Sequence, residues 1–243
     1  MQYDPFWPFY TLDCAPRSSL YGQRPTLRRI GAPGPLLSFA EARLHLKLDP
    51  LPLHSTTRAL LPDADVAPNP DDALVKGLLL AVQAEVDGWS GFLNRAVAEQ
   101  TWELSFSSFP TAFRLPLPPF REILSVKSLG LDGEWVDVDE VWQVEPGDVA
   151  QPCALFRLQP GGVWPDLPNY TYAPLSAVQI RFKAGYQAGD PELELVKAYA
   201  KLRLGTFYEN RESSLVGTTA VDLPGFANML ENVRANCPDF LRS

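Results

Sequence analysis

The sequence is poor in the residues that many enzymes and metal sites use: of its 243 residues only two are histidines and three are cysteines. The histidines, His45 and His54, lie in no HExxH pattern, and no CxxC pair occurs. Zinc sites depend on such spacings, so neither a zinc enzyme nor a zinc-stabilised domain is predicted. Phosphate-binding loops of the GxGxxG and P-loop types are also absent. We therefore expect no metal, no cofactor and no catalytic residue.

Long apolar runs are missing as well. The longest aliphatic stretch, Leu78–Val82 with its flanks, is far shorter than the roughly 20 residues that span a bilayer. The first residues have no basic region and no leucine-rich core, so no secretory signal is expected. Three widely separated cysteines leave one unpaired, which favours reduced thiols in a cytosolic compartment over a disulfide framework. They are Cys14, Cys153 and Cys237.

The chain has no excess of basic residues, and its formal net charge is −8 at pH 7. An acidic protein does not hold nucleic acid by neutralising phosphates, although DNA can slide past a surface of like charge without sticking. From Ser128 to Phe156 there is no Lys or Arg. The acids of this stretch have three interpretations: a solvated hairpin face, a channel lining formed by Asp137, Asp139 and Glu140, or a glycosidase pair. The first two interpretations are favoured over catalysis.

Residues 1–37 are rich in proline and are predicted to form an extended N-terminal arm. Proline fixes φ and lacks an N–H donor, so neither a helix nor a central strand is expected there. Exposed aromatic side chains need a partner surface. The arm lies on its own domain or docks on a neighbouring subunit, and the sequence leaves both possibilities open. Its first aromatic residues are Phe6, Trp7, Phe9 and Tyr10.

Two helices are predicted next along the chain. Ser38 and Glu41 form a capping box at the start of the first helix. Residues 50–69 contain several prolines and are expected to form a long loop. The second helix has Asn69 as its N-cap, and apolar residues at helical spacing predict that it continues to Leu93.

The apolar period changes to two from Gln100, which predicts strands. Asp132-Gly133 supplies a hairpin turn, and in the last strand Val178, Ile180 and Phe182 alternate with polar residues. Successive strands without a helix between them predict an antiparallel sheet folded as a small sandwich or barrel. The predicted strands are 101–107, 112–117, 123–131, 134–144, 154–159 and 177–184.

The chain returns to helix at Pro191, and a final short helix is predicted before Pro238. The apolar stripe of that final helix is expected to pack on the helical domain; it consists of Phe226, Met229, Leu230 and Val233. The predicted fold class is α+β, with an antiparallel β-sandwich or barrel-like module inserted into a helical domain. The predicted boundaries are 1–37 for the arm, 38–99 and 190–236 for the helical domain, 100–189 for the β module and 237–243 for a C-terminal tail.

Several short motifs occur along the chain: Leu37–Asp49 (LSFAEARLHLKLD), Gln100–Leu104 (QTWEL), Arg114–Pro119 (RLPLPP), Ser125–Ser128 (SVKS) with Asp132-Gly133, Val178–Tyr186 (VQIRFKAGY) and Tyr208–Glu212 (YENRE). Together these segments resemble the phage head–tail connector (adaptor) family, which also occurs in the tails of gene transfer agents. Each segment alone is a weak signal, but they occur in the family's order over about residues 37–235. The arm and the loop 50–69 are longer than the usual family pattern.

This resemblance implies a helical connector domain and a subunit of a ring, expected to be a dodecamer docked under the portal protein of the virion. Assembly would take place in the host cytoplasm, without a membrane partner. The ring would extend the DNA channel, through which genomic DNA passes without specific binding. It would also present a surface to the next tail-side connector, a stopper or tail terminator.

Two groups of residues are candidate contacts under this resemblance. The family's C-terminal helix and tail enter the portal side of the joint, so the candidate portal contacts are Phe240, Leu241 and Arg242. The charged helix end is either solvated or paired across a subunit boundary. We predict pairing across the boundary, so the candidate interface residues include Tyr208, Glu209, Asn210, Arg211 and Glu212. The arm aromatics are added to them on the interpretation that the arm docks on a neighbouring subunit.

Two alternatives from other classes remain. One is a tail or baseplate binding module that recognises a glycan or a partner protein through its β module. Such a protein would be monomeric or trimeric and would not bind the portal. The other is an enzyme, for example a carboxylate-based glycosidase, against which the lack of catalytic residue spacing counts.

Overall fold

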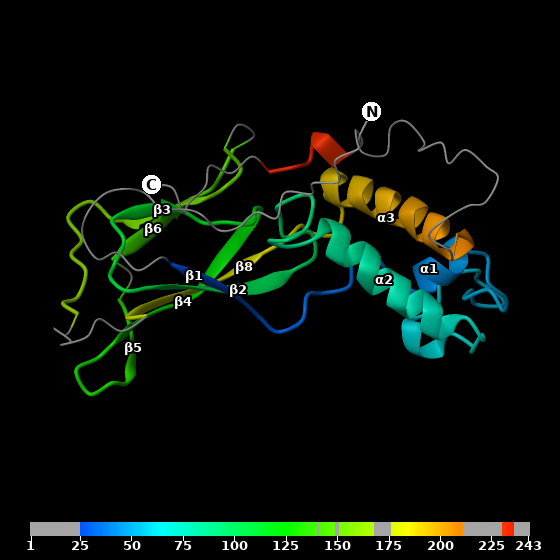
Figure 1. Ribbon diagram of the computed structural model, residues 1–243, viewed down its shortest axis with the longest axis horizontal. Helices are drawn as coiled ribbons and strands as arrows, with labels where there is room; N and C mark the ends of the chain where they lie inside the picture. The colour runs from blue at the N-terminus through cyan, green and yellow to red at the C-terminus, as the bar shows by residue number, and fades with distance from the viewer. Residues whose placement is uncertain (1–24, 140, 149–150, 168–175, 211–229, 236–243) are drawn as a thin grey trace, which may run out of the picture.

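The structure is a computed structural model that describes residues 25–139, 141–148, 151–167, 176–210 and 230–235. A β region and a helical region lie end to end along the long axis (Figure 1). The elements in chain order are β1 (Thr26–Ile30), α1 (Phe39–His45), a 3₁₀ helix η1 (Asp63–Asp65), α2 (Asp72–Val86), β2 (Gln100–Phe106), β3 (Ala112–Arg114), β4 (Phe120–Leu129), β5 (Trp135–Asp137), β6 (Trp142–Glu145), β7 (Leu155–Leu158), β8 (Val178–Ala184) and α3 (Pro191–Glu209).

The capping box predicted for the first helix is confirmed. The Ser38 hydroxyl accepts from the Glu41 N–H, and the Glu41 carboxylate accepts from the Ser38 N–H, both at 3.0 Å. The two bonds satisfy N–H groups that a helix start otherwise leaves unpaired. Asp63 accepts from two further N–H groups of the same turn, at 3.0 and 2.8 Å, and thereby fastens the following loop to α1.

The second helix is shorter than predicted. The Asn69 side chain does accept an N–H bond, from Asp71 at 2.8 Å, but α2 begins at Asp72. It ends at Val86 and does not reach Leu93, because Asp87 leaves the helical conformation with ψ 141°. Leu93 still packs in the helical core, which is why the spacing suggested two more turns, whereas Trp89 is 39% exposed.

One hydrophobic cluster joins all three α-helices. It combines segments from both ends of the sequence, and Leu230 and Val233 of the predicted final helix belong to it. The packing of these two residues agrees with the prediction, whereas Phe226 and Met229 lie outside the described residues. The best buried members include Val75, Val82, Val86, Leu93, Val196, Ala200 and Leu204.

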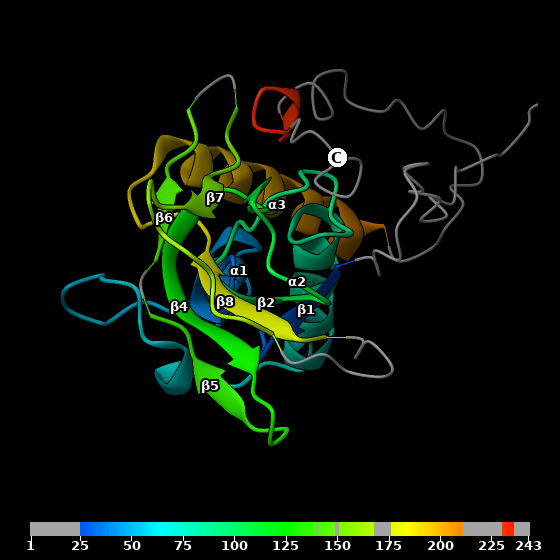
Figure 2. The ribbon, with the colours of Figure 1, turned by 90° about the vertical axis from the view of Figure 1, so that its left-hand side faces the viewer.

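The β region contains two antiparallel sheets. The five-stranded sheet has the order β1-β2-β8-β4-β5, and the three-stranded sheet has the order β3-β7-β6. Viewed from the far end of the β region, the sheets lie in front of the helices (Figure 2). The α+β class and the antiparallel pairing are therefore confirmed.

Both sheets contribute to a second hydrophobic cluster, separate from the helical one. The alternation predicted for the last strand is correct: Val178, Ile180 and Phe182 are buried, and the polar residues between them are only half-buried. Stacked and tilted aromatic rings fill the space toward the three-stranded sheet. They belong to Phe106, Phe109, Phe113, Trp142, Phe156 and Trp164.

Two parts of the β region differ from the predictions. The predicted strand 134–144 is two strands, β5 and β6, which belong to different sheets. Residues 26–30 of the predicted arm form β1, an edge strand that pairs with β2 from Thr26↔Ser105 to Ile30↔Thr101. An edge position is compatible with the neighbouring prolines, because only one side of the strand needs donors.

Two further sequence expectations concern the environment of the chain. Cys153 is buried and disulfide-bonded, so the expectation of reduced cysteines is wrong for this residue. Among the described residues, none of the helices is long and apolar enough to cross a membrane.

Candidate interaction surfaces

The most completely buried charge of the described residues is that of Arg43, on α1. Its guanidinium forms an ion pair with Asp72 at 2.8 Å. It also donates to three backbone carbonyls, those of Leu48, Pro50 and Ala67, at 3.3, 2.8 and 2.9 Å. A guanidinium can occupy the core only when most of its donors are satisfied. Here both terminal nitrogens have partners, whereas the buried Nε has none among the described residues. Arg43 therefore holds both ends of the long loop between α1 and α2.

A buried carboxylate stands where the two regions meet. Asp87 follows α2 and accepts from the Val97 N–H at 2.7 Å, from the Gln100 side chain at 2.6 Å and from the Gln83 side chain at 3.1 Å. Burial raises the pKa of the Asp87 carboxyl above its usual value, although the hydrogen bonds it accepts act in the opposite direction. The Gln83 amide continues the connection by donating to the Gly34 carbonyl at 2.8 Å.

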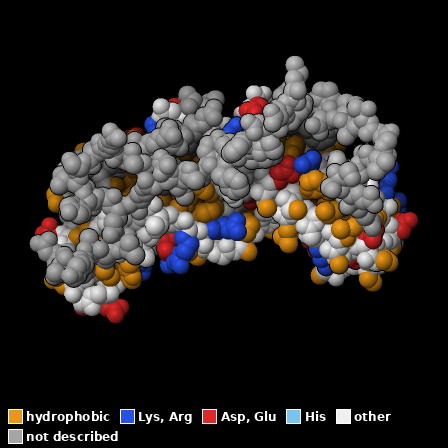
Figure 3. Space-filling view, in the orientation of Figure 1, with side chains coloured by type: hydrophobic (Ala, Val, Ile, Leu, Met, Phe, Trp, Pro, Cys, Tyr) orange, Lys and Arg blue, Asp and Glu red, His pale blue; other side chains and the backbone are white. Residues whose placement is uncertain are grey.

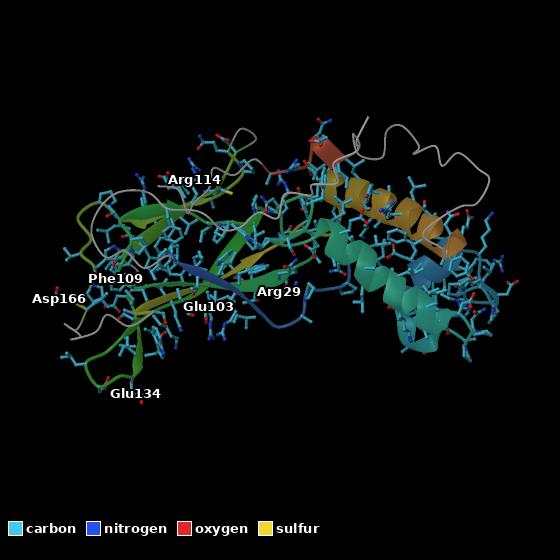
Figure 4. All side chains as sticks on the ribbon, in the orientation of Figure 1. Arg29, Glu103, Phe109, Arg114, Glu134 and Asp166 are labelled. Atoms are coloured by element: carbon cyan, nitrogen blue, oxygen red, sulfur yellow. The ribbon has the colours of Figure 1, made fainter. Side chains whose placement is uncertain are left out.

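A second buried carboxylate, Glu103, lies on the outer face of the five-stranded sheet (Figure 4). Its side chain is 3% exposed and forms ion pairs with Arg28 of β1 at 2.9 Å and with Arg181 of β8 at 2.7 Å. The strand register places these three residues in one row across the sheet. The rows on either side also contain ion pairs, Lys183–Glu122 at 3.0 Å and Lys127–Asp137 at 3.3 Å.

The predicted channel-lining acids lie at the edge of this sheet. Asp137 is exposed on β5 and pairs with Lys127, Asp139 is exposed after β5, and Glu140 lies outside the described residues. Other acids of the run serve local turns: Asp132 accepts from the Glu134 N–H at 3.0 Å and Asp148 from the Gln151 N–H at 2.6 Å. These local bonds fit a solvated hairpin face, and the channel lining stays a prediction.

The predicted interface residues at the end of α3 are held differently from one another. The Tyr208 hydroxyl donates to the Asp71 carboxylate of the same chain, and its ring packs against the helical core. Glu209 and Asn210 are exposed, and the Asn210 amide donates to the Thr206 carbonyl at 3.0 Å. Outside the described residues lie Phe6, Trp7, Phe9, Tyr10, Arg211, Glu212, Phe240, Leu241 and Arg242.

An apolar groove that the sequence did not predict runs between α2 and the segment 31–37, and its volume is about 540 Å³. Figure 3 shows hydrophobic side chains gathered on this side of the helical region. Leu80 stands out from α2 with 72% of its surface exposed. The exposed positions of α2 have a single charge: Ala73, Lys76, Gly77, Leu80, Ala81 and Ala84. The sequence predicts no role for these positions, because the apolar stripe that indicates the helix lies on its opposite side.

Chemical sites are not evident in the part of the chain that the structure describes. No group of three or more His, Cys, Asp or Glu residues in that part is placed to hold a metal ion. The features that stand out are therefore surfaces: a sheet face crossed by ion pairs and a helix face lined by apolar side chains.

Comparison with known proteins places this fold in a particular class. No family model and no curated protein matches the sequence. Solved structures do match: a chain in the neck of an empty gene transfer agent particle, computed with C6 symmetry, has a TM-score of 0.59 at 22% identity, over 86% of this chain and 95% of that chain. A chain in the virion of a native gene transfer agent particle gives 0.55 at 19% identity, over 86% and 94%.

A chain in the neck of a native gene transfer agent particle, computed with C12 symmetry, gives a TM-score of 0.53 at 19% identity, again over 86% of this chain and 94% of that chain. At these identities the likeness shows a shared fold. The protein thus has the fold of chains found in the necks of gene transfer agent particles. The resemblance to head–tail connectors that the sequence motifs predicted is confirmed at this level.

Proposed function

We propose that this chain is a structural head–tail connector subunit that forms a ring under the portal and has no catalytic activity. The observation that carries the proposal is the shared fold with neck chains over nearly their whole length, 95% in one case. The order of the sequence motifs between residues 37 and 235 supports the same family independently. In this proposal the helical region is the connector domain, and the two sheets form the sandwich-like inserted module.

The symmetry of the related particles supports self-association. The neck structures with this fold were computed with C6 and C12 symmetry, which is what a ring of twelve copies allows. A ring of identical subunits uses heterologous contacts, in which two different faces of the subunit meet. We propose a dodecamer at the head–tail junction of the virion, assembled in the host cytoplasm, with the portal on one side and a stopper or tail terminator on the other.

The charge of the chain suits a DNA conduit. With a net charge of −8, the ring would repel the phosphate backbone and let genomic DNA pass without specific binding. Asp137, Asp139 and Glu140 are the proposed channel-lining residues. The tail beyond Pro238, with Phe240, Leu241 and Arg242, is the proposed portal contact. Each copy gains a small binding free energy by burying a few apolar side chains, and these gains add up around a ring.

Deletion of the gene tests the function directly. Heads and tails should assemble in its absence but stay separate, because nothing joins them, and electron microscopy of the lysate should show both as free particles. A plasmid copy of the gene is the control and should restore joined particles. Normal infectious particles from the deletion strain would show that the chain is not the connector.

A structure of the isolated neck and the mass of the protein with portal test the finer assignments. A complex of portal with a ring of this chain is expected, with Asp137 and Asp139 near the axis. A monomer or trimer that ignores the portal would favour the tail or baseplate binding module, which recognises a glycan or a protein. If Asp137 and Asp139 point away from the axis, they do not line the channel, but the proposal of a ring is unaffected.

A further inference from the structure

The groove beside α2 is a preformed surface and not a gap between loosely placed elements. Its second wall, the segment 31–37, is fixed to α2 through the side chain of Gln83. The Gln83 amide donates to the Gly34 carbonyl at 2.8 Å, and its oxygen accepts from the Leu36 N–H at 3.2 Å. A third bond, from the Gly34 N–H to the Glu99 carbonyl at 3.1 Å, holds the same wall to the start of β2. Such a groove keeps its shape without an occupant.

The walls of the groove are apolar, and its rim is cationic. Pro33, Pro35, Phe39, Leu79 and Leu80 are among the lining side chains. Two cations stand at the rim, and neither has a carboxylate partner within the described residues. Lys76 lies 4.8 Å from the centroid of the Phe39 ring, and Arg29 lies 6.0 Å from that of the Trp102 ring. The other charged lining residues, Asp63 and Asp87, are occupied by the hydrogen bonds described above.

An occupant of this groove should therefore be aromatic or aliphatic, with an acidic group close by. The first residues of the chain have this composition: Tyr3-Asp4-Pro5-Phe6-Trp7-Pro8-Phe9-Tyr10. Proline-interrupted aromatic segments remain extended and pack well into narrow grooves walled by proline and aromatic side chains. Asp4 supplies a carboxylate for Lys76 or Arg29.

The position of β1 beside the groove favours docking within the same molecule. The chain enters β1 at Thr26, and Arg29 of that strand already lines the groove, about 10 Å further along. Residues 11–24 between the aromatic segment and Pro25 span up to about 45 Å when extended, which is ample for a return. A tether of this length gives the segment an effective concentration of about millimolar at its own groove.

We infer that residues 3–10 dock in the groove between α2 and the segment 31–37 of their own chain. Docking covers Leu80 and the apolar face of α2, and it places Asp4 beside the rim cations. This inference does not depend on ring formation, because it concerns a contact within one subunit. It assigns an occupant to the apolar face of α2.

Photocrosslinking in the full chain tests the contact. Phe9 is replaced by the photoreactive p-benzoylphenylalanine, isotopically heavy and light chains are mixed, and cross-linked peptides are identified by mass spectrometry after irradiation. We expect cross-links to peptides containing residues 29–39 or 73–84, joining heavy to heavy and light to light. Their yield should stay constant on dilution, as expected for a contact within one chain.

A variant with a charged side chain in the groove tests the same contact. Leu80→Glu should lower the yield of these cross-links at least about tenfold, because a carboxylate replaces a large apolar contact. Leu131→Glu is the matched control: Leu131 is 88% exposed in the β4–β5 turn, far from the groove, and its replacement should leave the yield unchanged. Both positions are exposed, so both variants should fold, which circular dichroism checks.

Three results would overturn the inference. Cross-links that join heavy to light chains would place the segment in the groove of a neighbouring copy. Cross-links to other parts of the chain would assign the segment to another surface. An unchanged yield in Leu80→Glu would show that the groove does not hold the segment.

Discussion

On the outer face of the five-stranded sheet each of three rows of polar residues contains an ion pair, whereas the exposed positions of α2 include a single charged side chain and no ion pair. The sheet face thus satisfies its charges within the subunit. The helix face leaves apolar area and Lys76 without a carboxylate partner among the described residues, and Arg29 of β1 likewise lacks one at the rim of the groove. Contacts with other segments are therefore expected at the helical region, while the sheet face can stay in water.

The two regions also differ in how they bury charge. In the helical region Arg43 has no exposed surface, and three of its four hydrogen-bond partners are backbone carbonyls. In the β region Glu103 is buried by two arginines that are themselves 68% and 42% exposed. Removal of the first charge leaves unsatisfied groups in a dry core, and removal of the second leaves arginines that water can reach.

The largest expected effect is therefore at Arg43. Arg43→Ala should lower the free energy of unfolding by about 3–5 kcal/mol, because Asp72 and three carbonyls lose their donors in a buried site. Urea denaturation followed by circular dichroism measures this change. Arg58→Ala, at an exposed position of the same loop, is the control and should have little effect. Equal stability of the two variants would contradict the role of Arg43 as the clamp of the loop.

A smaller loss is expected on the sheet. Glu103→Gln keeps the size of the side chain but removes the charge between two arginines, and it should cost about 1–2 kcal/mol. Asp137→Asn breaks an ion pair on the same face, but the Asp137 side chain is 77% exposed, so a change within about 0.5 kcal/mol is expected. Urea denaturation of both variants decides the comparison. A loss at Asp137 as large as that at Glu103 would show that burial does not govern these pairs.

The smallest effect is a pH dependence at the junction of the two regions. Burial raises the pKa of Asp87 in the folded state, so its contribution to stability is full below its unfolded-state pKa and is lost as pH rises through the folded-state value. Asp87→Asn cannot titrate. The stability of the wild type relative to this variant should therefore fall between pH 4 and pH 7 in urea denaturation. A relative stability that increases over this interval would mean that the pKa is lowered instead.

Local patterns in the sequence predicted much of the fold. The capping box of Ser38 and Glu41 needs only residues three apart, and the alternation in Val178–Ala184 needs only one strand. Both predictions are correct for this reason. The end of α2 could not be predicted in the same way, because Asp87 is held by Val97 and Gln100, which the helical pattern does not include.

The candidate surfaces were harder to predict than the fold. Arg43 lies in the predicted first helix, and its burial depends on the carbonyls of residues 48, 50 and 67. The period of two from Gln100 places Glu103 on the face opposite Trp102. One of the arginines that bury Glu103 lies on β1, however, within the segment that was predicted to be an extended arm. Long-range partners of this kind leave no periodic signal in the sequence.

The crossing from α2 to β2 and the crossing from β8 to α3 lie side by side. The chain leaves the helical region near Val97 and returns near Tyr186, and the Tyr186 N–H donates to the Val97 carbonyl at 3.1 Å. A segment whose ends are joined in this way can grow, shrink or be exchanged in evolution without moving α2 relative to α3. Related proteins can therefore keep one helical framework while the strands between these crossings diverge to suit different particles.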